Sequence, residues 1–216
     1  MKKIIISLLI AFSFIIGSYG QENENNREKQ KSSEVQTLFG RNKISNGGYG
    51  GFGVGYSTID NRDAIVTSAR GAWVIGHGLA LGFAGTGFLN SYQYDPMLDT
   101  DFNLAGGYGG LLVEPILLGR FPVHLSFPTI AGIGGVAYTQ SQWTNDPWGT
   151  QDAWIEDYAN FFIFEPGVEL EFNILKFFRF AVGVSYRMTS EINLINTAPD
   201  ALTGLSGGMT FKFGKF

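Results

Sequence analysis

Residues 161–190 read FFIFEPGVELEFNILKFFRFAVGVSYRMTS, and this stretch decides the fold of the chain. Large apolar residues alternate with small or charged residues at every second position, once up to residue 173 and again from residue 177. A period of two predicts two β-strands with unlike faces rather than helices. The large face holds Phe162, Phe164, Pro166, Val168, Leu170, Phe172, Phe178, Phe180, Val182, Val184, Tyr186 and Met188, and the other face holds Glu165, Gly167, Glu169, Glu171, Arg179, Ala181, Gly183, Ser185, Arg187 and Thr189.

The chemical character of the two faces separates the possible classes of β-protein. In a soluble sandwich the exposed face is rich in Lys, Thr and Glu, and two apolar faces pack against each other. Here the small face is mostly Gly, Ala and Ser with a few charges, which suits the crowded interior of a narrow closed barrel, whereas the large aromatic face suits lipid. We therefore expect an all-β, transmembrane antiparallel up-and-down β-barrel, with a soluble secreted sandwich or lipocalin-like barrel as the alternative.

The same alternation recurs along the chain and predicts eight strands. The connections between them alternate in length, as in membrane barrels that have short turns at one end and long loops at the other. Residues 60–62 are the exception, because they form a short connection where a long loop is expected. Ten strands are possible if residues 139–160 form a hairpin of their own. The predicted strands cover 48–59, 63–75, 79–89, 103–116, 122–138, 161–173, 177–190 and 202–216.

The N-terminal residues predict export. Two lysines precede an apolar run over Ile4–Ile16, which is shorter than the roughly 20 residues that a membrane-spanning helix needs, so an uncleaved anchor is only the alternative. Small residues before Gln21 favour cleavage by a signal peptidase at that point. The residues that follow are polar and mixed in charge, which predicts disorder. The expected organisation is a signal peptide over 1–20, a disordered lead-in over 21–46 and the barrel over 47–216.

Composition excludes several kinds of site. The chain has no Cys, which excludes disulfides and thiolate metal sites, and its two His do not suggest a multi-His metal centre. The formal net charge is −4, so nothing indicates a nucleic-acid partner. No cofactor and no metal are expected.

The chain ends in Phe216, after a segment in which Met209, Phe211 and Phe213 alternate with other residues. Together with the eight strands and the signal peptide, this terminal aromatic gives a resemblance to small Gram-negative outer-membrane β-barrel proteins of the eight-stranded OmpA/OmpX-like group, over roughly residues 47–216. The resemblance implies a monomer in the outer membrane with a periplasmic lead-in. It also implies outer-membrane lipid and the barrel assembly machinery as partners, with Phe216 as the assembly signal. In a regular strand Phe216 would point to the opposite face from Phe213. We therefore expect a bulge at Gly214, which would bring the two side chains to the same face.

One short motif bears on enzymatic activity, since some barrels of this size modify lipid A. His124-Leu125-Ser126 has a His-x-Ser spacing that resembles the lipid A deacylases, in which the His activates the Ser. The pattern departs from that family, which has Asn after the Ser, because Phe127 and Pro128 follow here. His124 also follows a short turn, at the end of the barrel opposite to that family's site. We therefore predict no catalytic residue and no enzymatic activity.

Two predicted outer loops combine acidic with aromatic residues. No Lys or Arg occurs between Arg120 and Lys176. Acidic groups among aromatic side chains suit an unknown surface ligand, although aromatic residues also form a girdle at the rim of membrane barrels. The loop around Asp99 lacks the Gly and the terminal Glu of an EF-hand, so calcium binding is not predicted. The candidate interaction residues of the loops are Tyr92, Tyr94, Asp95, Trp143, Trp148, Trp154 and Tyr158.

Charges on the small face predict a network inside the barrel. If the tight turn at 174–176 places Asn173 opposite Phe177, Glu171 faces Arg179, and the remaining charges lie opposite or diagonal to one another. Such a network would fill a lumen that is only wide enough for side chains. The predicted function is a structural or surface-interaction protein, with a small porin-like pore for ions or solutes as the alternative and a lipid-modifying enzyme third. The network comprises Glu165, Glu169, Glu171, Arg179 and Arg187.

Overall fold

The computed structural model describes residues 46–96, 100–140 and 154–216. The predicted signal peptide, almost all of the predicted lead-in, and the loop candidates Trp143 and Trp148 lie outside the described residues. The described residues all belong to one compact unit. Within the described ranges, no helix has the length and apolar character that crossing a membrane requires.

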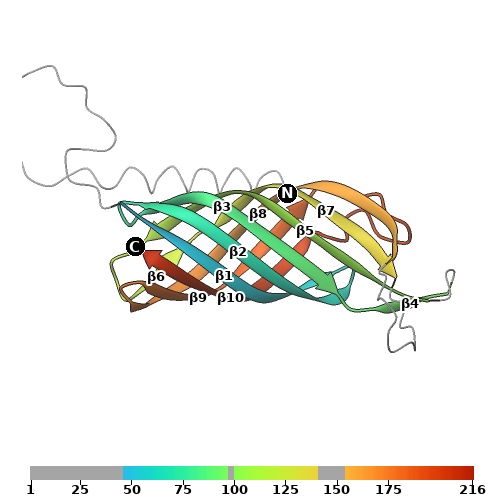
Figure 1. Cartoon of the computed structure of the whole chain (residues 1–216), viewed down its shortest axis with the longest axis horizontal. Coiled ribbons are helices and arrows are strands. Elements are labelled where there is room, and N and C mark those ends of the chain that lie inside the picture. The colour runs from blue at the N-terminus through green and yellow to red at the C-terminus, as the bar shows by residue number, and fades with distance from the viewer. Residues whose placement is uncertain (1–45, 97–99, 141–153) are drawn as a thin grey trace, which may run out of the picture. The chain divides into compact units, whose positions relative to one another are not determined.

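The described chain consists of β-strands joined by turns and loops (Figure 1). The apolar, β-branched and aromatic residues that alternate along it favour extended backbone. The strands are β1 (Asn46–Ile59), β2 (Arg62–Ile75), β3 (Leu79–Asn90), β4 (Gln93–Asp95), β5 (Thr100–Leu117), β6 (Val123–Ser126), β7 (Thr129–Gln140), β8 (Trp154–Leu175), β9 (Phe178–Thr189) and β10 (Gly204–Lys215).

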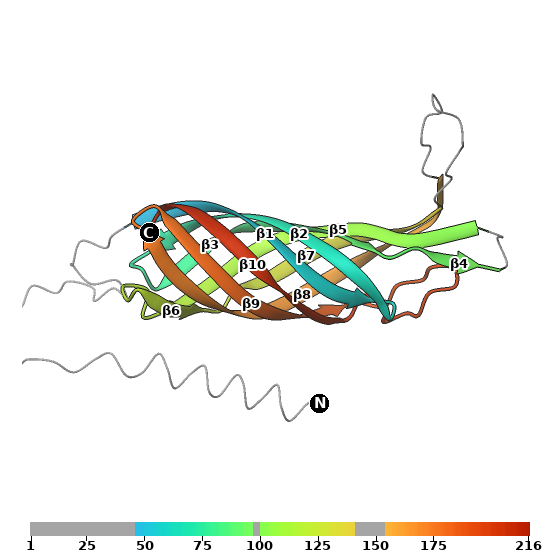
Figure 2. The ribbon, with the colours of Figure 1, turned by 90° about the horizontal axis from the view of Figure 1, so that it is seen from below.

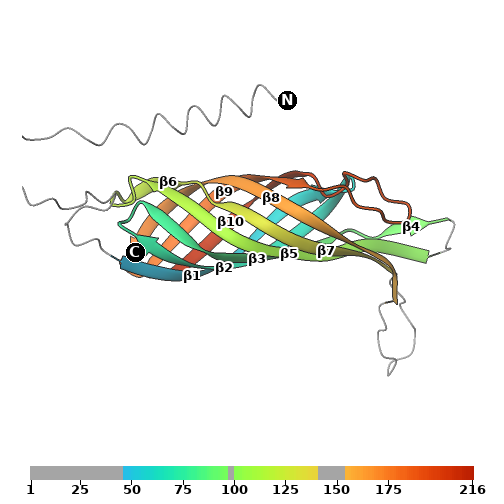
Figure 3. The same ribbon diagram turned by 90° about the horizontal axis from the view of Figure 1, so that it is seen from above.

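The strands close into a ring in which all neighbours are antiparallel. β10 pairs with β1 from Ser57↔Ser206 to Gly48↔Lys215, so the sheet has no free edge along this seam. Around the ring the order is β1, β2, β3, β5, β6 together with β7, β8, β9 and β10. Figures 2 and 3 show these strands winding obliquely around one barrel. The predicted all-β antiparallel barrel of eight ring strands is confirmed.

β6 and β7 act as one barrel strand that is interrupted at Phe127 and Pro128. Their pairing with β8 keeps a single register across the break. The ladder is interrupted because Pro128 has no N–H to donate, whereas the Phe127 N–H still donates to the Pro115 carbonyl at 2.9 Å. The strand predicted over 122–138 therefore contains one break.

The ten-stranded alternative concerns residues 139–160, of which 141–153 lie outside the described residues. β7 runs to Gln140 and β8 starts at Trp154, and these two residues pair, so the described parts of 139–160 extend the barrel strands instead of forming a separate hairpin. A register shift occurs between Tyr138 and Thr139. The additional strand is β4, which lies in the predicted loop before β5 and pairs with the start of β5.

The barrel has two unlike ends. At the short-turn end, residues 76–78, 118–122 and 176–177 connect the strands, and both Asn46 and Phe216 lie there. At the long-loop end, the β3–β5, β7–β8 and β9–β10 connections are long, and only the β1–β2 turn is short. In Figure 1 the label β6 marks the short-turn end and β4 the long-loop end.

The outward face of the barrel is apolar. Phe83 is 69% exposed, Ile133 66% and Phe162 72%. A closed barrel that exposes apolar side chains all around its wall requires lipid around it. Inward positions are small where strands approach closely, since a Cβ atom at Gly132 would lie 2.1 Å from the Gly109 carbonyl oxygen.

Apolar side chains fill the lumen toward the long-loop end, and we term this group the apolar cap. Ile192, Leu194 and Leu202 of the β9–β10 connection are all buried in it. They pack against inward-facing residues of the barrel strands, which brings the connection over the mouth of the barrel. The apolar cap comprises Ile59, Ala64, Val66, Phe88, Phe102, Leu104, Tyr108, Val136, Tyr138, Phe161, Ile163, Ile192, Leu194, Ala201 and Leu202.

Candidate functional site: a charge cluster across the lumen

A cluster of buried charges lies inside the barrel toward the short-turn end, around Lys212 of β10. Lys212 points inward because it precedes Phe213, which faces outward and is 45% exposed. Its Nζ lies 2.5 Å from Glu114 Oε1 and 3.0 Å from Glu169 Oε2, and it also pairs with Glu171. Lys212 is 1% exposed, so these carboxylates replace the water that its ammonium group would otherwise bind.

Two ion pairs of the cluster span the bore of the barrel. Lys212 on β10 and Glu114 on β5 lie on strands that are four places apart in either direction around the ring. Arg70 on β2 and Glu169 on β8, whose Nη2 and Oε1 atoms are 2.9 Å apart, are also four places apart. Since such strands are diametrically opposite, both pairs cross the lumen.

Opposite charges balance within this group, which we term the charge cluster. Its carboxylate oxygens lie within 4.8 Å of one another. Carboxylates this close would repel one another strongly without cations between them. The Tyr49 hydroxyl donates a further hydrogen bond to Glu114. The anions are Glu114, Glu169 and Glu171, and the cations are Arg70, Arg179 and Lys212.

The register between β8 and β9 differs from the predicted one. A register shift between Asn173 and Leu175 places Glu171 opposite Ala181 instead of opposite Arg179. Arg179 is the diagonal neighbour, and its Nη1 lies 3.3 Å from Glu171 Oε2. The predicted register is wrong because a tight turn fixes the pairing only when no irregularity follows it.

Glu165 and Arg187, which were predicted to join the same network, are not members of the charge cluster. Glu165 accepts hydrogen bonds from the Tyr108 hydroxyl at 2.6 Å and from Ser185 Oγ at 2.7 Å. Arg187 is fully buried and donates to the backbone carbonyl of Leu202. In the described part of the chain, no carboxylate lies within ion-pair distance of Arg187.

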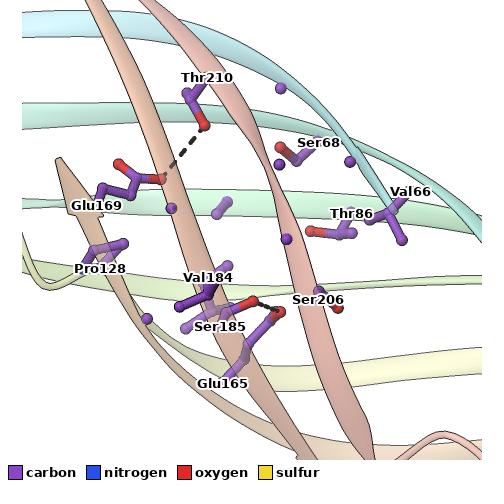
Figure 4. A pocket seen from close by; sticks show the side chains of 18 of the residues that line it. Val66, Ser68, Thr86, Pro128, Glu165, Glu169, Val184, Ser185, Ser206 and Thr210 are labelled. Atoms are coloured by element: carbon purple, nitrogen blue, oxygen red, sulfur yellow. Dashed lines mark hydrogen bonds between the residues drawn. The ribbon is translucent and has the colours of Figure 1, made fainter. Parts of the chain in front are cut away.

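A cavity of about 100 Å³, lined by both apolar and polar side chains, adjoins both the charge cluster and the apolar cap. Figure 4 shows Thr210 directed toward Glu169 and Ser185 directed toward Glu165 on its wall. Ser68, by contrast, contributes a hydroxyl with no carboxylate beside it in this view. A cavity of this volume has room for several water molecules, since one needs about 10–15 Å³, and its polar side chains offer them hydrogen-bond partners.

His124 and Ser126 also contact the charge cluster. His124 Nε2 lies 2.8 Å from Glu171 Oε2, and Ser126 Oγ donates to Glu171 Oε1 at 2.9 Å. Ser126 is therefore bonded to the carboxylate and not to the histidine, and its side chain is fully buried. A catalytic serine needs a base on its own hydroxyl and access to substrate. Here the histidine does not contact the Ser126 hydroxyl, and burial keeps Ser126 away from solvent.

Phe216 lies against the charge cluster at the short-turn end instead of facing lipid. The register between β1 and β10 is unbroken up to Lys215, so the bulge expected at Gly214 is absent. The Phe216 ring stacks on the Tyr49 ring at a centroid distance of 5.8 Å. Arg179 Cζ lies 3.9 Å from the centroid of the Phe216 ring, which is a cation–π contact.

The described loop candidates lie on separate parts of the long-loop end. Tyr92 and Tyr94 are 53% and 54% exposed beside or within β4, and Tyr158 of β8 is 71% exposed. β5 and β7 lie between β4 and β8 in the sheet. Asp95 lies in β4, and Trp154 is the first residue of β8.

The sequence analysis missed Arg70, Glu114 and Lys212, although a signal for each was present. Each is a charged residue whose immediate neighbours in its strand are small or apolar, at a position whose parity points inward. Parity assigns such a residue to the lumen, but it does not reveal which strands lie opposite. The partners therefore become visible only in the closed ring.

The comparisons with known proteins come from structure alone, since no protein-family model and no curated protein matches the chain. Neisserial surface protein A (NspA) is 12% identical, with a TM-score of 0.49, over 81% of this chain and 100% of that chain. Ail of Yersinia pestis, in complex with the heparin analogue sucrose octasulfate, is 10% identical, with a TM-score of 0.43, over 79% and 98%. The N-terminal β-barrel domain of Pseudomonas aeruginosa OprF is 11% identical, with a TM-score of 0.38, over 78% and 96%. These similar structures are small outer-membrane β-barrels of the group that the sequence resembles.

Proposed function

We propose that this chain is an outer-membrane β-barrel with a side-chain-filled lumen, and that it acts as a structural or surface-interaction protein through its long loops. The apolar outward face supports a place in lipid. In barrels of this kind the short turns and the termini face the periplasm, so the short-turn end is assigned to that side. The proposal includes removal of residues 1–20 before Gln21, a lead-in over 21–46, and Phe216 as the assembly signal.

Two ion pairs that cross the bore are the observation on which this proposal rests. Lys212 with Glu114 and Arg70 with Glu169 join opposite walls at nearly the same depth. Any solute passing through would have to separate these buried charges, and removing one partner from a buried pair costs about 3–5 kcal/mol. The apolar cap adds a second obstruction toward the long-loop end. A barrel obstructed in this way presents its loops, and not its lumen, to ligands.

A small pore is the second candidate, and the cavity between the charge cluster and the apolar cap is the observation that favours it. For this cavity to conduct, both obstructions would have to open. A liposome swelling assay with monosaccharides and amino acids separates the two candidates. The closed barrel gives the same swelling rate as empty liposomes, whereas a pore gives faster swelling for the smaller solutes.

A lipid-modifying enzyme is the third candidate. Ser126 and His124 are buried inside the barrel wall and engage Glu171, so a lipid acyl chain cannot reach them without opening the charge cluster. Mass spectrometry of lipid A from cells with and without the protein tests this candidate, and identical spectra are expected.

The surface-interaction role is tested in intact cells. A photo-crosslinking residue placed at Tyr158 or Tyr92, which are exposed at the long-loop end, should capture a surface component. The matched control is a crosslinker at Phe177, which is exposed at the short-turn end. If the loop positions capture nothing, or only a component that the Phe177 control also captures, only the structural role remains.

A further inference from the structure

The exposed charges of the barrel are separated by sign between its two ends. At the short-turn end, three exposed cations come from three different places: Arg120 from the β5–β6 connection, Lys176 from the β8–β9 turn and Lys215 from the end of β10. No Asp or Glu side chain of the described residues is exposed at this end, because Glu114 and Glu171 are fully buried in the lumen. We term the three cations the basic rim.

The long-loop end has the opposite sign. Among the described residues, Arg62 is its only Lys or Arg that is not buried, since Arg187 is fully buried, and Arg62 is bound to Asp60 at 2.9 Å. Several carboxylates of the strands and connections at this end are at least partly exposed. They belong to Asp60, Asp63, Asp101, Asp157, Glu191 and Asp200.

The basic rim lies among exposed apolar side chains. Leu118 and Phe121, on either side of Arg120 in the β5–β6 connection, are 63% and 58% exposed. Ile174 and Phe177, which flank Lys176, are 55% and 58% exposed. Turns with these side chains do not extend into water as soluble loops do. They hold the cations where the apolar region of a bilayer meets its headgroups, the usual depth for amphipathic cationic side chains.

A neighbouring histidine adds no charge of its own. Burial, and after it the Arg120 and Arg179 guanidinium groups, lower the pKa of His77 in the β2–β3 turn. His77 is therefore neutral at neutral pH, and the positive charge of this end comes from the basic rim.

We infer that the basic rim binds the phosphate groups of anionic phospholipids in the membrane leaflet at the short-turn end, and so fixes the depth and orientation of the barrel. This inference rests on the proposed place in a membrane. Lipid is favoured over a soluble polyanion because exposed apolar residues flank the cations of both turns. Each Lys or Arg near an anionic membrane surface strengthens association about fivefold.

The test uses the refolded barrel in nanodiscs that contain equal amounts of phosphatidylglycerol and phosphatidylethanolamine. The protein is then released from the nanodiscs in the mass spectrometer, and native mass spectrometry counts the lipids of each kind that remain bound to it. We expect retained phosphatidylglycerol to exceed phosphatidylethanolamine for the wild type. In the Arg120→Gln/Lys176→Gln/Lys215→Gln variant this ratio should fall at least about fivefold. A matched control, Asp101→Asn/Glu191→Gln/Asp200→Asn, changes three charges at the other end and should keep the wild-type ratio.

Equal retention of both lipids by the wild type, or an unchanged ratio in the triple variant, overturns the inference. Inorganic polyphosphate is the soluble probe. If it binds the wild type and not the triple variant while the lipid ratio stays at one, the rim recognises a soluble polyanion instead. Heat-modifiable migration on gels is read for each sample. A folded, nanodisc-inserted barrel without lipid preference contradicts only this inference, whereas failure to insert contradicts the proposed function itself.

Discussion

Lys212 reaches Glu114 across the full bore of the barrel, with its Nζ 2.5 Å from Glu114 Oε1. The two residues lie 98 positions apart in the sequence and on opposite strands of the ring. Glu169 and Glu171 of β8 contact the same ammonium group. One side chain therefore ties three parts of the barrel wall together, and its loss should affect the whole barrel.

The Lys212→Met change should lower the free energy of unfolding by about 3–5 kcal/mol, because it leaves buried carboxylates without their shared cation. Urea unfolding of the refolded protein in lipid vesicles measures this. The vesicles consist of zwitterionic lipid, so that the basic rim has no anionic lipid to bind. Lys215→Met is then the matched control, since Lys215 is exposed on the same strand and should change stability by about 0.5 kcal/mol or less. The Glu114→Gln/Lys212→Met double change should cost less than the sum of its single changes, because the two residues are in contact. Similar costs for Lys212→Met and Lys215→Met would show that the cluster is not dry.

Deletion of Phe216 should impair assembly in cells more than it impairs the finished barrel. The ring stacks on Tyr49 and covers Arg179, a contact whose loss costs about 1–3 kcal/mol. If Phe216 is the assembly signal, as proposed, its deletion removes that signal altogether. The measurement compares the outer-membrane level in cells with the unfolding free energy of protein refolded without any machinery. Phe216→Tyr keeps the ring and should be normal in both. A normal outer-membrane level for the deletion would contradict the signal role.

Two glycines test which face of the wall is crowded. A Cβ atom at inward-facing Gly132 would lie 2.1 Å from a backbone oxygen, whereas at outward-facing Gly85 its nearest neighbour would be 3.9 Å away. Gly132→Ala should therefore destabilise the barrel by about 1–3 kcal/mol. Gly85→Ala should be neutral or slightly stabilising, because it removes backbone entropy from the unfolded chain without a clash. Urea unfolding of the two variants gives the comparison, and a larger loss for Gly85→Ala would reverse the assignment of the faces.

Removal of residues 21–45, with the signal segment retained, should leave insertion intact. Their polar, mixed-charge composition cannot bury enough apolar surface to form a core. The β1–β10 seam closes without them, since its pairing starts at Gly48. Heat-modifiable migration of the truncated protein from outer-membrane fractions is the measurement. A truncated protein that no longer migrates as a folded barrel would show that the segment is structural.

The sequence was sufficient to predict the ring strands and which of their residues face the lumen. The alternation of inward and outward residues depends only on their order within a strand. It assigned Glu169, Glu171 and Arg179 to the inside, where they are buried. It failed on the β8–β9 register, because a shift between Asn173 and Leu175 leaves no mark in the alternation.

Contacts across the barrel were beyond the reach of the sequence for a different reason. Which residues meet across the bore depends on the stagger of all the strands around the ring. The meeting of Lys212 with Glu114 and the position of Phe216 over Arg179 both follow from that stagger. No local sequence pattern encodes the stagger of the strands around the whole ring.

Single-channel recording of the wild-type barrel in a planar bilayer tests the closed lumen most directly. The protein is refolded, inserted into the bilayer in symmetric KCl and held at potentials of both signs. The ion pairs across the bore and the apolar cap predict a baseline indistinguishable from that of the bare bilayer, while addition of a general porin to the same bilayer confirms that channels are detectable. Steady conductance steps from the wild-type protein, at a level that Lys212→Met alters and Lys215→Met does not, would contradict a lumen closed by the charge cluster.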